Sequence, residues 1–81
     1  MQPPNVNTYQ RGLVKAFHHA ELTVQELWLR YFALGGVVGP TEVDAYLNGL
    51  MTLAQADHNL LARAVNERLR ELPPPPLAPY Y

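Results

Sequence analysis

The sequence predicts an all-α fold, a small bundle of three to four short helices, and three observations support this. Apolar residues recur at spacings of three and four along most of the chain. Residues that favour helix starts, such as Thr23 and Thr41, precede these stretches, and Gly35 and Gly49 follow two of them. No segment shows the strict alternation expected of a half-buried β-strand.

Proline-containing ends flank a single expected domain at residues 8–72, since the chain has only 81 residues. Residues 1–7 combine prolines and asparagines with little apolar content and predict a flexible, disordered N-terminal arm. Residues 73–81 open with Pro73–Pro76 and predict a polyproline-type C-terminal tail. Such a tail can dock in an aromatic groove of a partner protein, and the alternative is a stiff tail without a partner.

The first two helices are expected from Asn7 onward. Asn7 is a favourable N-cap for a helix that carries Leu13 and Phe17 on its core face. Thr23 and Glu26 have the spacing of a capping box, in which each side chain accepts a hydrogen bond from the backbone N–H of the other residue. The second helix is therefore expected over Val24 to Leu34, and Gly35 is the expected left-handed residue that ends it.

Two further helices are expected after the Val37–Val38–Gly39–Pro40 linker, whose valines we expect to pack on the core. Thr41 is the expected cap of the third helix. Thr52 and Gln55 form a second capping-box pattern before a fourth helix that the prolines stop near Leu72. The expected core consists of Leu13, Phe17, Leu27, Trp28, Tyr31, Val43, Leu47, Leu50, Leu61, Val65 and Leu69.

Composition excludes several classes of function. The chain has no cysteine and no serine, so thiol and serine nucleophiles, disulfides and thiolate metal sites are impossible. The adjacent His18 and His19 point about 100° apart on a helix, so they are poorly placed to bind one metal together. Asp57 and His58 face apart for the same reason and lack a nucleophile. We therefore expect no enzyme activity, no cofactor and no metal.

The segment from Glu42 to Leu61 raises a DNA-binding alternative. Ala45, then Gly49 four residues later, and a following helix resemble the helix-turn-helix family, although Asn48 and Gln55 stand where that family has apolar residues. The resemblance implies a DNA-associated transcriptional regulator that uses the fourth helix. Its expected phosphate contacts are Arg63, Arg68 and Arg70. A net charge of −1 provides no basic face, which favours a different function.

The second helix is more apolar than a surface helix needs to be. Gln25, Glu26 and Arg30 are its only polar residues, so apolar side chains extend beyond the stripe that faces the core. Either the other helices surround it, or one side remains open to a partner. We favour a non-enzymatic protein–protein interaction module, a small regulator or adaptor, that homodimerises or binds another protein. The expected contact residues are Leu29, Phe32, Ala33 and Val37.

The expected location is the bacterial cytoplasm. No apolar run approaches the length that spans a bilayer, and the first ten residues lack the pattern of a secretory signal. Arginine outnumbers lysine five to one, and alanine and leucine are abundant, as in proteins from bacteria with GC-rich genomes.

Overall fold

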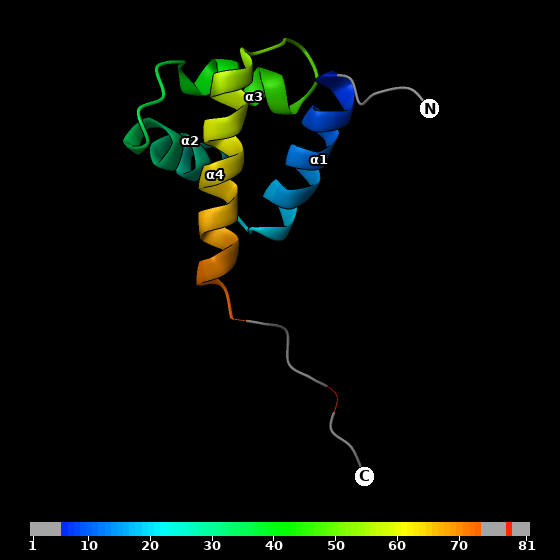
Figure 1. Cartoon of the computed structure of the whole chain (residues 1–81), viewed down its shortest axis with the longest axis vertical. Helices are drawn as coiled ribbons and strands as arrows, with labels where there is room; N and C mark the ends of the chain where they lie inside the picture. Colours follow the sequence, from blue (N-terminus) through cyan, green and yellow to red (C-terminus); the bar gives the residue numbers. More distant parts are fainter. Residues whose placement is uncertain (1–5, 74–77, 79–81) are drawn as a thin grey trace.

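Four helices and no strand make up the part of the chain that the structure describes, residues 6–73 and 78 (Figure 1). This computed structural model confirms the all-α bundle that the sequence predicts. Residues 1–5 of the expected arm, and 74–77 and 79–81 of the expected tail, lie outside the described residues. The helices are α1 (Val6–His19), α2 (Val24–Ala33), α3 (Pro40–Leu47) and α4 (Gln55–Glu71).

The helices pack mainly against neighbours that are distant in sequence. α4 lies between α1 and α2, and α3 also packs against both α1 and α2 (Figure 1). The backbones of α1 and α2 do not approach each other, and neither do those of α3 and α4. The core is therefore enclosed by four helix pairings, each between one of the first two helices and one of the last two.

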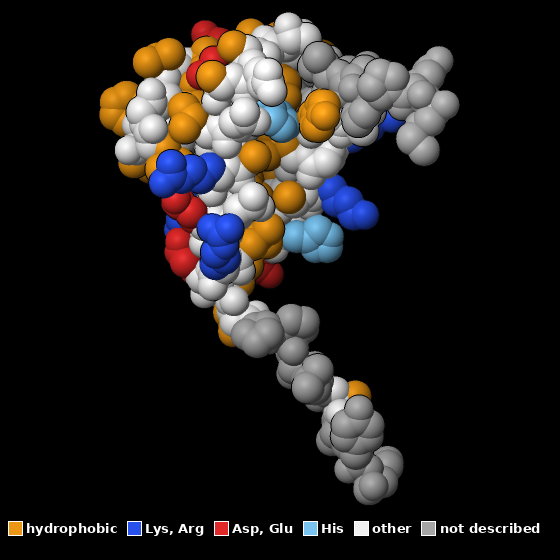
Figure 2. Space-filling model, in the orientation of Figure 1, with side chains coloured by type: hydrophobic (Ala, Val, Ile, Leu, Met, Phe, Trp, Pro, Cys, Tyr) orange, Lys and Arg blue, Asp and Glu red, His pale blue; other side chains and the backbone are white. Residues whose placement is uncertain are grey.

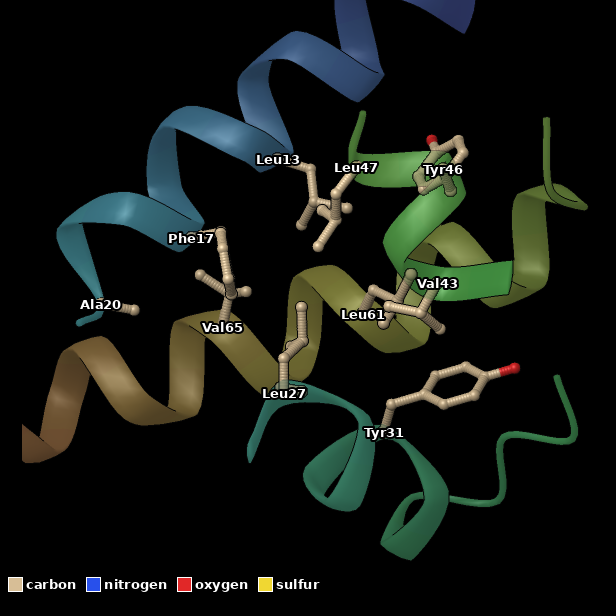
Figure 3. Packing of buried hydrophobic residues seen from close by; sticks show 11 residues of the cluster. Leu13, Phe17, Ala20, Leu27, Tyr31, Val43, Tyr46, Leu47, Leu61 and Val65 are labelled. Atoms are coloured by element: carbon tan, nitrogen blue, oxygen red, sulfur yellow. The ribbon is translucent and has the colours of Figure 1, made fainter. Parts of the chain in front are cut away.

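The core draws side chains from all four helices (Figure 3). Most of the expected core residues are buried, and Ala20, Tyr46 and Ala64 join them. Tyr31 and Tyr46 are among the largest fully buried side chains. In a chain this small, two buried tyrosines supply a large part of the apolar surface removed from water. The buried residues are Leu13, Phe17, Ala20, Leu27, Tyr31, Val43, Tyr46, Leu47, Leu61, Ala64 and Val65.

Three residues expected in the core lie elsewhere. Leu50 is 79% exposed, because α3 ends at Leu47 and the backbone turns outward at Gly49, where φ is +74°. Trp28 and Leu69 are only partly buried and pack against the outside of the core.

Of the four helix starts that the sequence predicts, only the start of α2 agrees with the structure. Thr23 caps α2, and its hydroxyl accepts from the Glu26 N–H at 3.1 Å while the Glu26 carboxylate accepts from the Thr23 N–H at 2.9 Å. The bond from the Thr23 N–H to the carboxylate is the main cause that lowers the pKa of Glu26. α1 begins at Val6 rather than after Asn7.

The expected caps of α3 and α4 are wrong. Gly39 is the N-cap of α3, because Pro40 takes the first helical position, where a missing N–H costs nothing. Thr41 therefore lies inside the helix. α4 begins at Gln55 after Ala54, without a side-chain cap, so Thr52 does not form the predicted capping box.

Candidate functional site

Apolar side chains cover the side of α2 that faces away from the core. Leu27 and Tyr31 point inward, whereas Leu29 is 53% exposed and Phe32 is 58% exposed. Ala33 is also exposed, and Val37, in the loop after the helix, is 88% exposed. We call Leu29, Phe32, Ala33 and Val37 the outer α2 face. All four residues named from the sequence as partner contacts are therefore accessible.

The hydroxyl of Tyr31 holds the loop that carries Val37. It accepts hydrogen bonds from the backbone N–H groups of Val37 at 3.1 Å and Val38 at 3.0 Å. It donates to Oδ1 of Asp57 on α4 at 2.6 Å. In Figure 3 the ring extends along the edge of the core with its hydroxyl pointing away from Leu27. Burial of the ring, followed by the bond to Asp57, raises the pKa of Tyr31.

Trp28 fixes the same loop from a second direction. Its indole Nε1 donates to the carbonyl oxygen of Val38 at 2.9 Å. Its ring also packs on Phe32, with ring centroids 5.3 Å apart and planes inclined by 30°. The half-buried indole thus joins the loop to the outer α2 face. Such an aromatic pair restricts the Phe32 side chain before any partner arrives.

Two glycines allow the chain to turn closely around Tyr31. Gly35 has φ +100°, a conformation that glycine adopts without strain. A Cβ at Gly36 would lie 2.2 Å from the Tyr31 ring, so only glycine fits there. The sequence signals Gly35 as a helix end but gives no sign of the loop's anchors. Of the two valines expected to pack inward, Val38 does so and Val37 does not.

An ion pair joins Arg30 of α2 to Glu71 of α4. Arg30 donates two hydrogen bonds to the Glu71 carboxylate, at 2.6 Å and 2.8 Å, and these bonds lower the pKa of Glu71. Arg30 and Glu26, four residues apart on one helix, also have a spacing that favours an ion pair. The bidentate contact across α2 and α4 replaces that pair.

The arginines of the DNA-binding alternative do not form one free basic surface. Arg63 pairs with Glu67 at 3.3 Å, as its spacing predicts. Nε of Arg68 donates to the carbonyl oxygen of Ala20 at 3.2 Å, and Arg70 is exposed. The connection between α3 and α4 spans residues 48–54, longer than the usual turn of about 3–4 residues in a helix-turn-helix motif. These features give the alternative no added support.

The histidines have separate surroundings. His18 and His19 are both exposed at the end of α1, and the His18 ring lies beside Phe17. His58 is partly buried, and burial lowers its pKa. Within residues 6–73 and 78, no three His, Asp or Glu side chains lie close enough together to hold a metal ion.

Comparison with known protein families, curated proteins and solved structures found no match. The described helices also include none that is long and apolar enough to cross a membrane. A function for this chain can therefore be inferred only from its own surface features.

Proposed function

We propose that this protein is a non-enzymatic interaction module whose outer α2 face binds the same face of a second copy. The main observation behind this proposal is that Leu29, Phe32 and Val37 are each more than half exposed. Tyr31 and Trp28 fix the loop next to them through hydrogen bonds to its backbone. A rigid apolar surface loses little conformational entropy when it binds, and that favours association.

The size of the face is in the range of functional patches. Phe32 is 58% exposed and would bury about 150–250 Å² if enclosed, and with the smaller Leu29 and Val37 the three expose about 300–400 Å². The largest apolar patch on a typical monomer is about 300–600 Å² and is often functional. A standard interface buries about 800 Å² on each partner, so flanking residues such as Gln25 and Trp28 must contribute the remainder.

The chemistry of the face suits a second copy. None of its four residues is charged, and the nearby Arg30 is already paired with Glu71, so contact between two identical faces opposes no unpaired like charges at these positions. Bulky Phe32 lies next to small Ala33 on α2. In a symmetric contact, Phe32 of one molecule can therefore occupy the space beside Ala33 of the other. Symmetric dimers of this kind are the commonest soluble oligomers.

The oligomeric state in solution tests this proposal. Light scattering of the full chain should give the mass of a dimer, and Phe32→Asp and Leu29→Asp should each give a monomer with unchanged helical circular dichroism. Leu50→Asp is the matched control, because Leu50 is as apolar as Leu29 and is more exposed but lies outside the face. A monomeric parent chain, or dissociation by Leu50→Asp as well, would contradict the proposal.

In this proposal the module acts as a small regulator or adaptor in the bacterial cytoplasm. The excess of arginine over lysine supports a bacterial source, and the lack of a secretory pattern in the first ten residues supports this location. The proline-rich tail supplies a second contact with partner proteins.

A further inference from the structure

A groove runs between α1 and α4, on a different side of α4 from α2. It encloses about 270 Å³. In Figure 2, orange side chains lie in the strip between α4 and α1, with pale-blue and blue side chains beside them. The groove has an apolar floor that includes Leu13, Ala16, Ala62 and Val65. Its lining also includes Tyr9 and His58, whose rings meet edge to face with centroids 6.2 Å apart.

Gly12 opens this groove without being required by the chain's own packing. It lies inside α1, where glycine is less favourable than alanine. A Cβ built at this position would meet nothing within 4 Å, and the helix has no positive φ there. Together with Ala16 and Ala62, Gly12 leaves space for the backbone of another segment to approach closely.

The edges of the groove carry a lysine, an arginine and a histidine. On α1, Lys15 and His19 follow the lining residues Gly12 and Ala16 by three positions, and residues at this spacing are neighbours on a helix surface. On α4, exposed Arg70 follows the lining residue Asn66 by four. Among the described residues that line the groove, none is an aspartate or a glutamate.

We propose that this groove binds an amphipathic helix of a partner protein that carries acidic residues beside its apolar stripe. The groove is smaller than a typical ligand cavity of about 300–1,000 Å³, so it suits one or two inserted side chains of a helix. The cations Lys15 and Arg70 attract the flanking carboxylates, and the exposed His19 offers them a hydrogen-bond donor.

A second copy of this chain fits the groove less well than such a partner. The acidic helix α3 carries Glu42 and Asp44, but its large apolar residues Val43, Tyr46 and Leu47 are buried. The outer α2 face is apolar but has no acidic residue among its four members. The groove and the outer α2 face are separate, so the module can bind the partner helix whether or not it dimerises.

Two synthetic peptides of about four helical turns test the proposal. Both carry leucine and phenylalanine along one stripe, and they differ only in glutamate or lysine flanks. Each is titrated into the isotope-labelled full chain and followed by NMR. The glutamate peptide should shift the signals of Gly12, Ala16, Ala62 and Asn66 and should bind at least about tenfold more tightly at low salt than the lysine peptide.

Variants identify the groove and its charged edge. Gly12→Leu fills open space and should keep or raise the melting temperature while weakening peptide binding at least about tenfold. His19→Glu should weaken binding of the glutamate peptide, whereas His18→Glu should not, because it places the same charge about 100° around the helix.

Several results would overturn the proposal. These are no binding of either peptide at millimolar concentration, equal binding of both peptides, or unchanged binding by Gly12→Leu. Shifts at the outer α2 face instead of the groove would also overturn it. Concentration-dependent shifts at Gly12 without peptide, removed by Gly12→Leu, would assign the groove to a second copy and likewise overturn it.

Discussion

The hydroxyl of Tyr46 lies 2.6 Å from Nδ1 of His58, and this contact joins α3 to α4 where their backbones stay apart. The two rings meet edge to face, with centroids 5.9 Å apart and planes inclined by 84°. Burial raises the pKa of Tyr46 and lowers the pKa of His58, so the folded protein favours the neutral form of both. His58 also faces Tyr9 of α1, which places an imidazole at the junction of three helices.

Mild acid should therefore destabilise the fold through His58. Its pKa in the folded chain lies below the ordinary value of 6.5, so the unfolded chain binds more protons as the pH falls. This contribution to stability is present above pH 6.5 and is lost as the pH falls through the lowered pKa. Urea unfolding should show a smaller free energy of unfolding at about pH 5 than at about pH 7.5.

His58→Gln should remove most of this dependence on pH, although it also lowers stability at neutral pH through lost ring contacts. His18→Gln is the control and should retain the dependence. The carboxyl pKa values of Glu26 and Glu71 are lowered from 4.5, so these groups lose their contribution mainly at more acidic pH. An unchanged slope in His58→Gln would show that another group titrates.

Tyr31→Phe should destabilise the protein by about 1–3 kcal/mol, because it removes one hydroxyl and leaves three partners without it. The Val37 and Val38 N–H groups and the Asp57 carboxylate all bond to that hydroxyl. Chemical unfolding measures the loss, and NMR should show increased motion in the loop. Tyr9→Phe, at an exposed ring, should change the free energy of unfolding little. Equal effects of the two variants would contradict the role given to the Tyr31 hydroxyl.

Two glycine-to-alanine substitutions should act in opposite directions. Gly36→Ala places a methyl group 2.2 Å from the buried Tyr31 ring and should cost about 1–3 kcal/mol or more through overpacking. Gly12→Ala meets open space inside α1 and should stabilise the fold by about 0.5–1 kcal/mol. Melting temperatures of both variants against the parent chain provide the measurement. A stabilising Gly36→Ala would refute the close approach.

Sequence patterns predicted the helices better than their exact starts. Thr23 and Glu26 satisfy each other locally, so four residues suffice to predict that cap. Thr52 and Gln55 have the same spacing, and Thr41 is also a favourable cap residue, but competing local chemistry decides where these helices begin. Pro40 enters the helix ahead of Thr41, and the chain remains non-helical through Ala54.

The candidate surfaces were likewise predictable only in part from the sequence. Helical periodicity alone placed Leu29 and Phe32 opposite the core, because that geometry depends on one helix. The support beneath them was not predictable, since Tyr31 reaches a residue 26 positions later and Arg30 a residue 41 positions later. The groove beside Gly12 also depends on the pairing of α1 with α4, which no local pattern reveals.

The order of helix pairing has a consequence for synthesis on the ribosome. α1 and α2 emerge first, yet their backbones make no close contact, and both await α3 and α4. Leu61, Ala64 and Val65 of α4 complete the core, so the apolar faces of α1 and α2 stay uncovered until α4 has been synthesised. Until then the growing polypeptide offers those faces to chaperones, and a product truncated before α4 becomes a substrate for proteolysis.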